Sequence, residues 1–193
     1  MDERAVPTIL ALMASVAIAW LVSGRRSTRR SGRNAPGLTK RRLHRRNIRA
    51  AAYLVDEIGA SRSVPEAIGR LRGVDPLQFE EMILTAIQRR GHPIERNARY
   101  SGDGGVDGAV RIEGVRYLVQ AKRYASAIKP AHVRDFEAVC ATEGVRGLFV
   151  HTGRTGRASY EALAEGSSVT MISGSNLLKL LSGEPVETPS LSF

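Results

Sequence analysis

Four polar side chains in the middle of the sequence are of types that can bind a divalent cation and stabilise negative charge. Glu80 and Asp107 carry carboxylates, Gln120 carries an amide oxygen and Lys122 an ammonium group. Mg²⁺ prefers oxygen ligands of this kind and is usually held by one or two carboxylates, with waters completing its shell. Structural explanations stay open, because aspartates such as Asp103 and Asp107 are common in glycine-rich turns. A Gln and a Lys two residues apart could likewise lie on a solvated sheet surface.

The first element that must position these residues is a helix, predicted over residues 76–90. Asp75 is suited to cap its start, and Gly91 is suited to end it. Helical spacing puts Glu80 at the edge of the apolar stripe and Glu81 on the polar side. Of the two adjacent acids, we therefore expect Glu80 to face the rest of the fold and Glu81 to face solvent.

The next segment predicts a three-stranded meander. Its strands cover residues 94–101, 109–113 and 115–124, and the glycine-rich loop 102–108 stands between the first two. Side chains alternate between the two faces of a strand, so Gln120 and Lys122 share one face of the last strand.

At this point the chain resembles the Mrr-type restriction endonuclease catalytic domain of the PD-(D/E)xK nuclease superfamily. The resemblance covers about residues 75–181 and keeps the family's order. Single Gly-Asp-Gly turns are common, but several matching strings in order are specific. The matching strings are Phe79-Glu80, GDGGVDG at 102–108, VQAKR at 119–123, GLFVHTG at 147–153, and Ile172-Ser173-Gly174 with Leu177 and Leu181.

The resemblance implies a role for each polar residue. Asp107 would be the metal-binding aspartate, Gln120 would take the superfamily's second acidic position, and Lys122 would be the catalytic lysine. Glu80 matches the helix glutamate of the family. Mg²⁺, or alternatively Mn²⁺, would be held by Asp107, Glu80, the Gln120 amide oxygen and the carbonyl of Ala121, while Lys122 would stabilise charge on the scissile phosphate. Gln followed by x-Lys is the form that the Mrr-type family itself uses.

Two further residues receive structural interpretations. His151 stands where the family more often has a small or hydroxyl residue, and we expect a hydrogen-bonded histidine at a strand end rather than a catalytic or metal-binding one. Cys140 is expected to be a small buried hydrophobic side chain.

The fold class expected is α/β, with a restriction-endonuclease-like mixed sheet flanked by helices over residues 75–182. Helices are predicted at 130–142, 155–164 and 175–181, strands at 145–151 and 168–172, and a flexible tail at 183–193. Cations near the catalytic edge could bind DNA phosphates. They are Lys122, Arg123, Lys129, Arg154 and Arg157, with His132 and Arg134 nearby.

The net charge of +10 is concentrated in a short segment before the domain. Residues 25–49 contain eleven Lys or Arg and no acid, so the remainder of the chain is close to neutral. Residues 24–49 are interpreted as a basic linker, disordered up to residue 40. Residues 50–74 are interpreted as a helical connector, with helical periodicity from residue 41. The basic segment could be a stop-transfer signal, which we favour, or an arm for anionic lipid or DNA phosphates.

An uncharged apolar stretch covers residues 5–23 and is just long enough to cross a bilayer as a helix. The acids before it and the cations after it favour an uncleaved transmembrane anchor over a cleaved signal peptide, with the following domain in the cytoplasm. We therefore expect a single-pass protein of the cell membrane.

The leading hypothesis is a membrane-tethered, metal-dependent DNA endonuclease of restriction or defence type. A catalytically inactive, membrane-anchored DNA-binding module of the same fold and a branched-DNA or repair nuclease are the alternatives. The sequence leaves target sequence, DNA modification and oligomeric state open, including a homodimer.

Overall fold

The computed structural model describes residues 36–97, 105–161, 166–188 and 191–193. The predicted membrane-spanning stretch, the first part of the basic linker (residues 24–35) and Asp103 lie outside these residues. Within the described part of the chain, no helix is both long and apolar enough to cross a membrane. Residues 37–193 form one compact unit.

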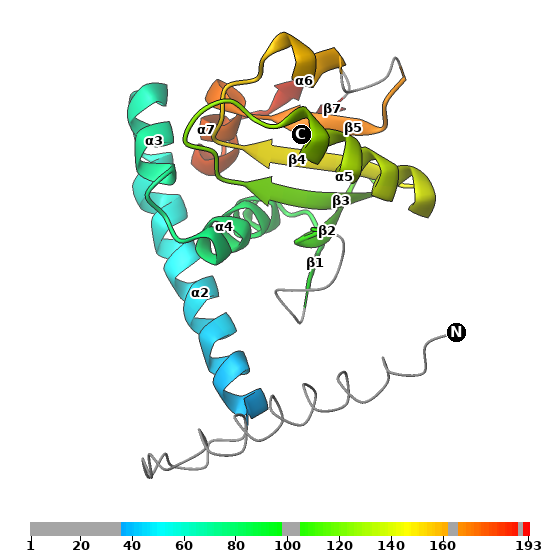
Figure 1. Cartoon of the computed structure of the whole chain (residues 1–193). Helices are drawn as coiled ribbons and strands as arrows, with labels where there is room; N and C mark the ends of the chain where they lie inside the picture. Colours follow the sequence, from blue (N-terminus) through cyan, green and yellow to red (C-terminus); the bar gives the residue numbers. More distant parts are fainter. Residues whose placement is uncertain (1–35, 98–104, 162–165, 189–190) are drawn as a thin grey trace, which may run out of the picture. The chain divides into compact units, whose positions relative to one another are not determined.

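Five strands make one mixed sheet in the order β1-β2-β3-β4-β5 (Figure 1). Strands β1 (Ile94–Arg96), β2 (Gly108–Ile112) and β3 (Val115–Lys122) are antiparallel neighbours, as the predicted meander requires. Strands β4 (Arg146–His151) and β5 (Val169–Ile172) then run parallel to β3. The α/β prediction is confirmed.

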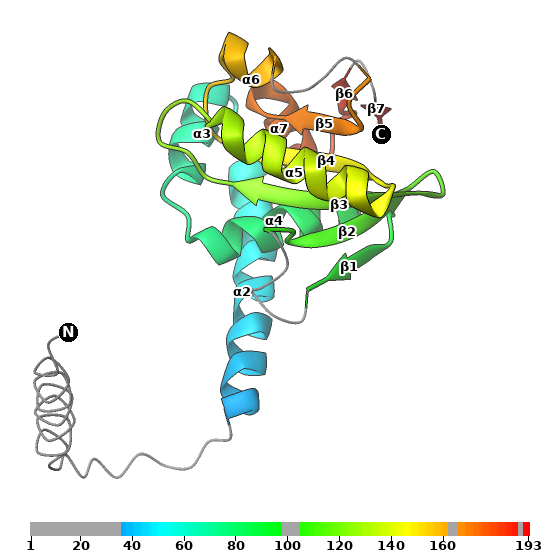
Figure 2. The ribbon, with the colours of Figure 1, turned by 45° about the vertical axis from the view of Figure 1, so that its right-hand side comes forward.

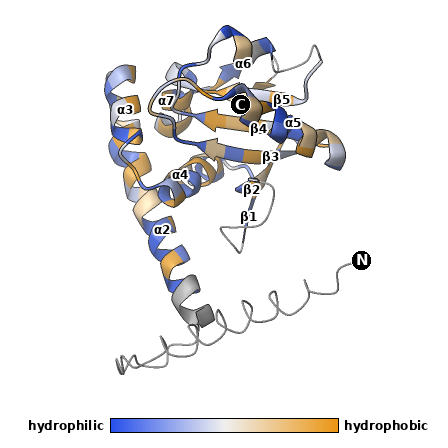
Figure 3. Ribbon diagram, viewed as in Figure 1, coloured by the Kyte–Doolittle hydropathy of each residue, from blue (hydrophilic) through white to orange (hydrophobic). Residues whose placement is uncertain are grey.

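Four helices cover one face of the sheet. They are α2 (Pro36–Gly59), α3 (Val64–Leu71), α4 (Pro76–Arg89) and α7 (Gly174–Ser182), and their apolar residues form a continuous core with the strands. Figure 3 shows the corresponding alternation of hydrophilic and hydrophobic bands along α2 and α4.

The other face of the sheet is covered mainly by α5 (Pro130–Glu143), which connects β3 to the parallel strand β4 (Figure 2). Its Phe136 and Cys140 pack with Leu118 and Phe149 in a second apolar cluster. The short helix α6 (Arg157–Glu161) follows β4. These elements lie within a few residues of their predicted positions.

Capping residues explain where α4 begins and ends. The Asp75 side chain accepts hydrogen bonds from the backbone N–H groups of Leu77 at 2.9 Å and Gln78 at 3.3 Å. Pro76 occupies the first turn, where its missing N–H costs nothing. After the last turn Gly91 adopts a left-handed φ of +86°, which glycine reaches without strain.

Helix α2 differs from the predicted division into a linker and a connector at residue 50. It runs without a break from Pro36, so the last part of the expected linker is helical. Ala51, Val55 and Ile58 are buried in the main core. The connector is therefore an integral part of the domain, because its apolar stripe packs into the same core as α4, α7 and the strands.

The described residues after α7 include a short hairpin, within the range 183–193 where a flexible tail is predicted. Strands β6 (Glu187–Thr188) and β7 (Leu191–Ser192) pair as a hairpin. Val186 is fully buried and exchanges two backbone hydrogen bonds with Phe193. The Arg90 guanidinium lies over the Phe193 ring at 5.4 Å. Burial of these apolar groups offsets the entropy of ordering a short segment.

Candidate active site

Asp107 stands directly before β2 and is bound to β3 through both its main chain and its side chain. Its N–H donates to the carbonyl of Val119 at 2.8 Å, continuing the β2–β3 ladder by one residue. Its carboxylate Oδ2 accepts a hydrogen bond from the N–H of Ala121 at 2.6 Å. The carboxylate is therefore fixed beside the C-terminal end of β3. Asp107 is more than a turn-forming residue, because its side chain bonds across the sheet.

Gln120 is buried, with only 3% of its surface exposed. Its Nε2 donates to the carbonyl of Gly105 at 2.5 Å, which leaves Oε1 as the free end of the amide. In the described part of the chain this buried oxygen has no hydrogen-bond partner. A buried polar atom without a partner costs free energy, so its presence calls for an explanation.

Gly105 brings the loop backbone close to both polar side chains of β3. It has a φ of +84°, and a Cβ built on it would collide with Nε2 of Gln120 and lie 4.0 Å from Nζ of Lys122. Only glycine allows the backbone to approach these side chains in this conformation. Gln120 and Lys122 thus share one face of β3, as period two predicts.

Glu80 lies within electrostatic reach of the same group. Burial, together with the charge of Asp107, raises the pKa of Glu80 to about 8, although Lys122 opposes the shift. Burial likewise raises the pKa of Asp107 to about 6, against the hydrogen bond from Ala121 and the charge of Lys122. The fold therefore brings two carboxylates and one ammonium group together at the end of β3.

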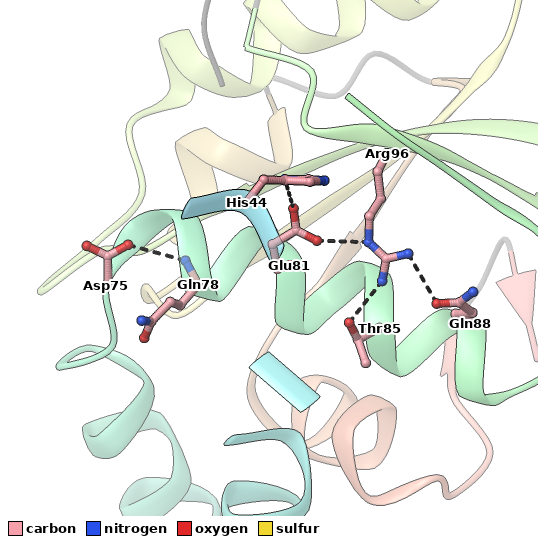
Figure 4. A network of polar contacts seen from close by, with 7 residues as sticks. All are labelled: His44, Asp75, Gln78, Glu81, Thr85, Gln88 and Arg96. Carbon is pink, nitrogen blue, oxygen red and sulfur yellow. Dashed lines mark hydrogen bonds and ion pairs between the residues drawn. The ribbon is translucent and has the colours of Figure 1, made fainter. Parts of the chain in front are cut away.

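Glu81, predicted to face solvent, is instead buried with 2% exposure. Its carboxylate lies 2.8 Å from Nε of Arg96 and 3.2 Å from Nδ1 of His44, as Figure 4 shows. The prediction was wrong because β1 and α2 cover the side of α4 that helical periodicity leaves polar. Glu81 holds three elements together, whereas Glu80 interacts electrostatically with Asp107 and Lys122.

Arg96 is a residue that sequence reasoning did not single out. Its guanidinium also donates to Thr85 Oγ1 at 3.1 Å and to Gln88 Oε1 at 3.2 Å. The next residue, Asn97, donates to the carbonyl of Val106 at 2.6 Å. Both ends of the loop that carries Asp107 are thereby fixed. Side chains alternate between the faces of a strand, so Arg96 shares the inward face of β1 with Ile94. This alternation is the sequence signal that could have indicated that Arg96 faces α4.

The predicted phosphate-binding cations are brought together only in part. Burial and the charges of Lys122 and Lys129 lower the pKa of His132, so these cations lie near one another. Arg154 joins them, because its backbone bonds to the segment just before Lys129.

Two other predicted cations have partners elsewhere. The Arg123 guanidinium donates to the carbonyl of Arg72 on the opposite face of β3. Arg157, which is highly exposed, forms an ion pair with Glu161 at 2.6 Å.

Both residues given structural interpretations, His151 and Cys140, are buried. His151 ends β4, is fully buried and lies with Nε2 3.3 Å from the Thr155 hydroxyl. Burial lowers its pKa to about 4. Cys140 is fully buried in the second apolar cluster, and burial raises the pKa of its thiol to about 11.

The donor set at the end of β3 fits a hard divalent cation. No three His, Cys, Asp or Glu side chains in the described part of the chain are grouped so as to hold a metal ion. Mg²⁺, however, is commonly held by only one or two carboxylates, with other oxygens completing the shell. Asp107 and Glu80 could supply the carboxylates. The buried Gln120 Oε1, which has no partner among the described residues, could supply a further oxygen.

Comparison with known families shows a match to a family model. The family model for the Mrr catalytic domain, described as a restriction endonuclease, matches residues 71–181, more than half of the chain. Among curated proteins, no match to the chain was found. A five-stranded mixed sheet flanked by helices fits the restriction-endonuclease-like fold.

Proposed function

The chain belongs to the Mrr-type restriction endonuclease family, and we propose that it is a metal-dependent endonuclease that hydrolyses phosphodiester bonds in DNA. The observation that carries the proposal is the Oε1 of Gln120, which is buried and has no hydrogen-bond partner among the described residues. It lies on the strand that also carries Lys122 and that bonds to the Asp107 carboxylate through Ala121. A domain that had lost its catalytic function would gain stability by replacing this amide with an apolar side chain. The retained amide is explained if the oxygen binds a cation.

The metal ligands proposed are Asp107, Glu80 and Gln120 through Oε1, with the carbonyl of Ala121 as a fourth. The N–H of Ala121 points to the Asp107 carboxylate. In an extended strand the N–H and C=O of one residue point to the same side, so the Ala121 carbonyl shares that side. Bound Mg²⁺ or Mn²⁺ would supply a Lewis acid that activates water and neutralises phosphate charge.

The chain's own residues position the reacting groups. Gln120 is held through Gly105, and Asp107 through Val119 and Ala121, so neither has to reorganise on binding DNA. The Lys122 ammonium group lies where it can stabilise negative charge on the scissile phosphate. Hydrolysis adds one water oxygen to phosphorus and breaks the bond to one sugar oxygen, which leaves with a proton.

Cleavage assays with the full chain test this proposal. Linear, circular and branched DNA should be incubated with Mg²⁺, with Mn²⁺ and with EDTA. We expect cutting only with metal, and loss of detectable cutting in Asp107→Ala, Lys122→Ala and Glu80→Ala. Ser61→Ala is a matched control on a residue outside the site.

Two outcomes would reject an enzymatic role. One is wild-type protein that binds DNA but never cuts it with either metal. The other is an Asp107→Ala protein that cuts as well as the wild type. In both cases the inactive DNA-binding module becomes the better account. Preference among the three DNA forms distinguishes a restriction enzyme from a branched-DNA nuclease.

We also propose that residues 5–23 anchor the protein in the cell membrane with the nuclease domain in the cytoplasm, where it could act against incoming DNA. The support is the uncharged apolar stretch, with acids before it and eleven cations after it. The protein should stay in membrane fractions during an alkaline carbonate wash. Release by that wash, or protease protection of the domain in intact spheroplasts, contradicts this placement.

A further inference from the structure

The N-terminal half of α2 carries exposed arginines that the proposed active site does not use. We call them the arginine face: Arg41, Arg42, Arg45, Arg46 and Arg49. In the described part of the chain, no ion pair joins any of them to an acidic side chain. The first acids of this helix come later, at Asp56 and Glu57, and both already have arginine partners. The positive charge of the arginine face is therefore unopposed within its own helix.

Helical geometry gathers these arginines on one side. At 3.6 residues per turn, the five positions fall within about 140° of the helix circumference. The buried residues Ala51, Val55 and Ile58 fall on the opposite side and pack into the core. Tyr53, which is 68% exposed, shares the arginine side. The helix thus divides cleanly into a core side and a cationic side.

Contacts with α4 hold this helix in a fixed orientation. His44, in the middle of the arginine segment, lies 3.2 Å from Glu81, the residue next to Glu80 (Figure 4). Further along, Arg89 bonds to Asp56 at 2.5 Å and to the carbonyl of Ala52 at 3.1 Å. The arginine face is therefore held beside the helix that carries Glu80 and is not part of a loose arm.

The surface of α2 favours a nucleic acid over a lipid bilayer as the partner. A helix that lies in a membrane surface needs an apolar side to insert below the headgroups. The apolar side of α2 is already buried against the domain, and the exposed large hydrophobic residues among its described side chains are Leu43 and Tyr53. Guanidinium groups, in contrast, match phosphate oxygens in a forked geometry and need no insertion.

We propose that the arginine face binds the phosphate backbone of the DNA substrate outside the active site. The proposal rests on the proposed function, since it takes DNA as the substrate. The face spans about 12 Å along the helix axis, enough to follow several phosphates. Contacts with phosphates alone add affinity without choosing a sequence.

The test is DNA binding by the full chain at a series of salt concentrations, with EDTA present so that no DNA is cut. Arg42→Gln/Arg46→Gln removes two charges from the face, and glutamine keeps the helix propensity. The slope of log affinity against log salt should become shallower by about 0.9 for each phosphate that the variant no longer neutralises, so by about 2. The matched control is Arg62→Gln/Arg111→Gln, which removes two exposed charges elsewhere. It should leave the slope within error of the wild type.

Three outcomes overturn the proposal. The first is an unchanged slope in Arg42→Gln/Arg46→Gln. The second is an equal decrease of the slope in both double variants, which would mean that only the total charge matters. The third is weaker binding to phosphatidylserine vesicles with DNA affinity unchanged, which would make the face a lipid-binding surface.

The binding test and the cleavage test of the proposed function can succeed or fail independently of each other. Binding is measured without metal, so a chain that never cuts DNA can still show the salt effect of the arginine face. Conversely, a chain that cuts with Mg²⁺ but shows no such effect keeps its nuclease role and loses this surface.

Discussion

The buried carboxylate of Glu81 lies 2.8 Å from Nε of the part-buried Arg96, while its neighbour Glu80 interacts electrostatically with Asp107 and Lys122. The adjacent acids Glu80 and Glu81 on α4 thus have different surroundings. Glu81 fixes α4 against β1 and α2, and Glu80 is left for the metal site that we propose. The pairing matters for function because α4 positions Glu80 and β1 leads into the loop that carries Asp107.

Removing the Glu81 carboxylate should therefore destabilise the whole domain. Glu81→Ala leaves the part-buried Arg96 without its main acceptor, and loss of one partner of a buried pair costs about 3–5 kcal/mol. Urea unfolding followed by circular dichroism measures this. Glu57→Gln breaks the exposed pair with Arg70 and should cost no more than about 1 kcal/mol. Equal losses of stability in the two variants would contradict a structural role for Glu81.

Gly105→Ala should impair cleavage more than stability. The new Cβ would displace Gln120 from its place beside Lys122. Gly114→Ala is the matched control, because Gly114 has a similar φ of +81° but open space around it. Both variants bear the backbone strain of a left-handed residue, about 1–2 kcal/mol. Only Gly105→Ala should raise the Mg²⁺ concentration needed for half-maximal cutting, and a similar rise in Gly114→Ala would count against this geometry.

Substitutions of Gln120 can distinguish the role of its Nε2, which donates to Gly105, from that of its Oε1, the proposed metal ligand. Gln120→Glu restores the carboxylate of the wider superfamily, so it should keep measurable cutting and need less Mg²⁺. It should also lower the melting temperature without metal, because the new oxygen faces the carbonyl of Gly105 in place of a donor. Gln120→Leu removes both ends and should abolish cutting. Full activity in Gln120→Leu would show that Oε1 is not a metal ligand.

Asp107→Asn should stabilise the metal-free protein at neutral pH. The folded pKa of Asp107, about 6, lies above its ordinary value of 3.8, so ionisation works against folding as the pH rises through this window. The stability difference between Asp107→Asn and wild type should grow from pH 4 to about pH 6 and then stay constant. Adding Mg²⁺ should raise the melting temperature of the wild type only. A metal-induced increase of the same size in Asp107→Asn would exclude Asp107 as a ligand.

The burial of His151 should make the stability of the protein depend on pH in the opposite direction from Asp107. Its folded pKa of about 4 lies below the ordinary 6.5, so the unfolded chain binds the proton more readily. Its contribution to stability is full above about pH 6.5 and is lost as the pH falls toward 4, by up to about 3 kcal/mol. Unfolding of His151→Gln over this range should show a flatter pH profile. If the pH profile of unfolding is the same in His151→Gln and wild type, His151 is not the cause of the loss of stability at low pH.

Local signals in the sequence predicted much of the fold and part of the site. The capping residue Asp75 and the alternation around Gln120 were predicted correctly, because caps and strand periodicity depend on near neighbours. The burial of Glu81 could not be predicted in this way, since it depends on α2 packing over α4. The hairpin at Val186 and Phe193 depends on Arg90, far away in the chain. The family resemblance, in turn, proposed the candidate site residues, which remain predictions, but it did not indicate the bond between Gln120 and Gly105.

The close approach of α2 to α7 limits how short a fragment of this domain can be and still fold. The family match begins at residue 71, yet Ala51, Val55 and Ile58 fill the same core as the matched segment. A Cβ on Gly59 would collide with the carbonyl of Leu181, so the two helices touch backbone to backbone. A gene fusion or expression fragment that starts at residue 71 would expose this apolar surface and aggregate. The segment that the family model matches is thus shorter than the unit that folds, and α2 has to be kept in any fragment meant to fold.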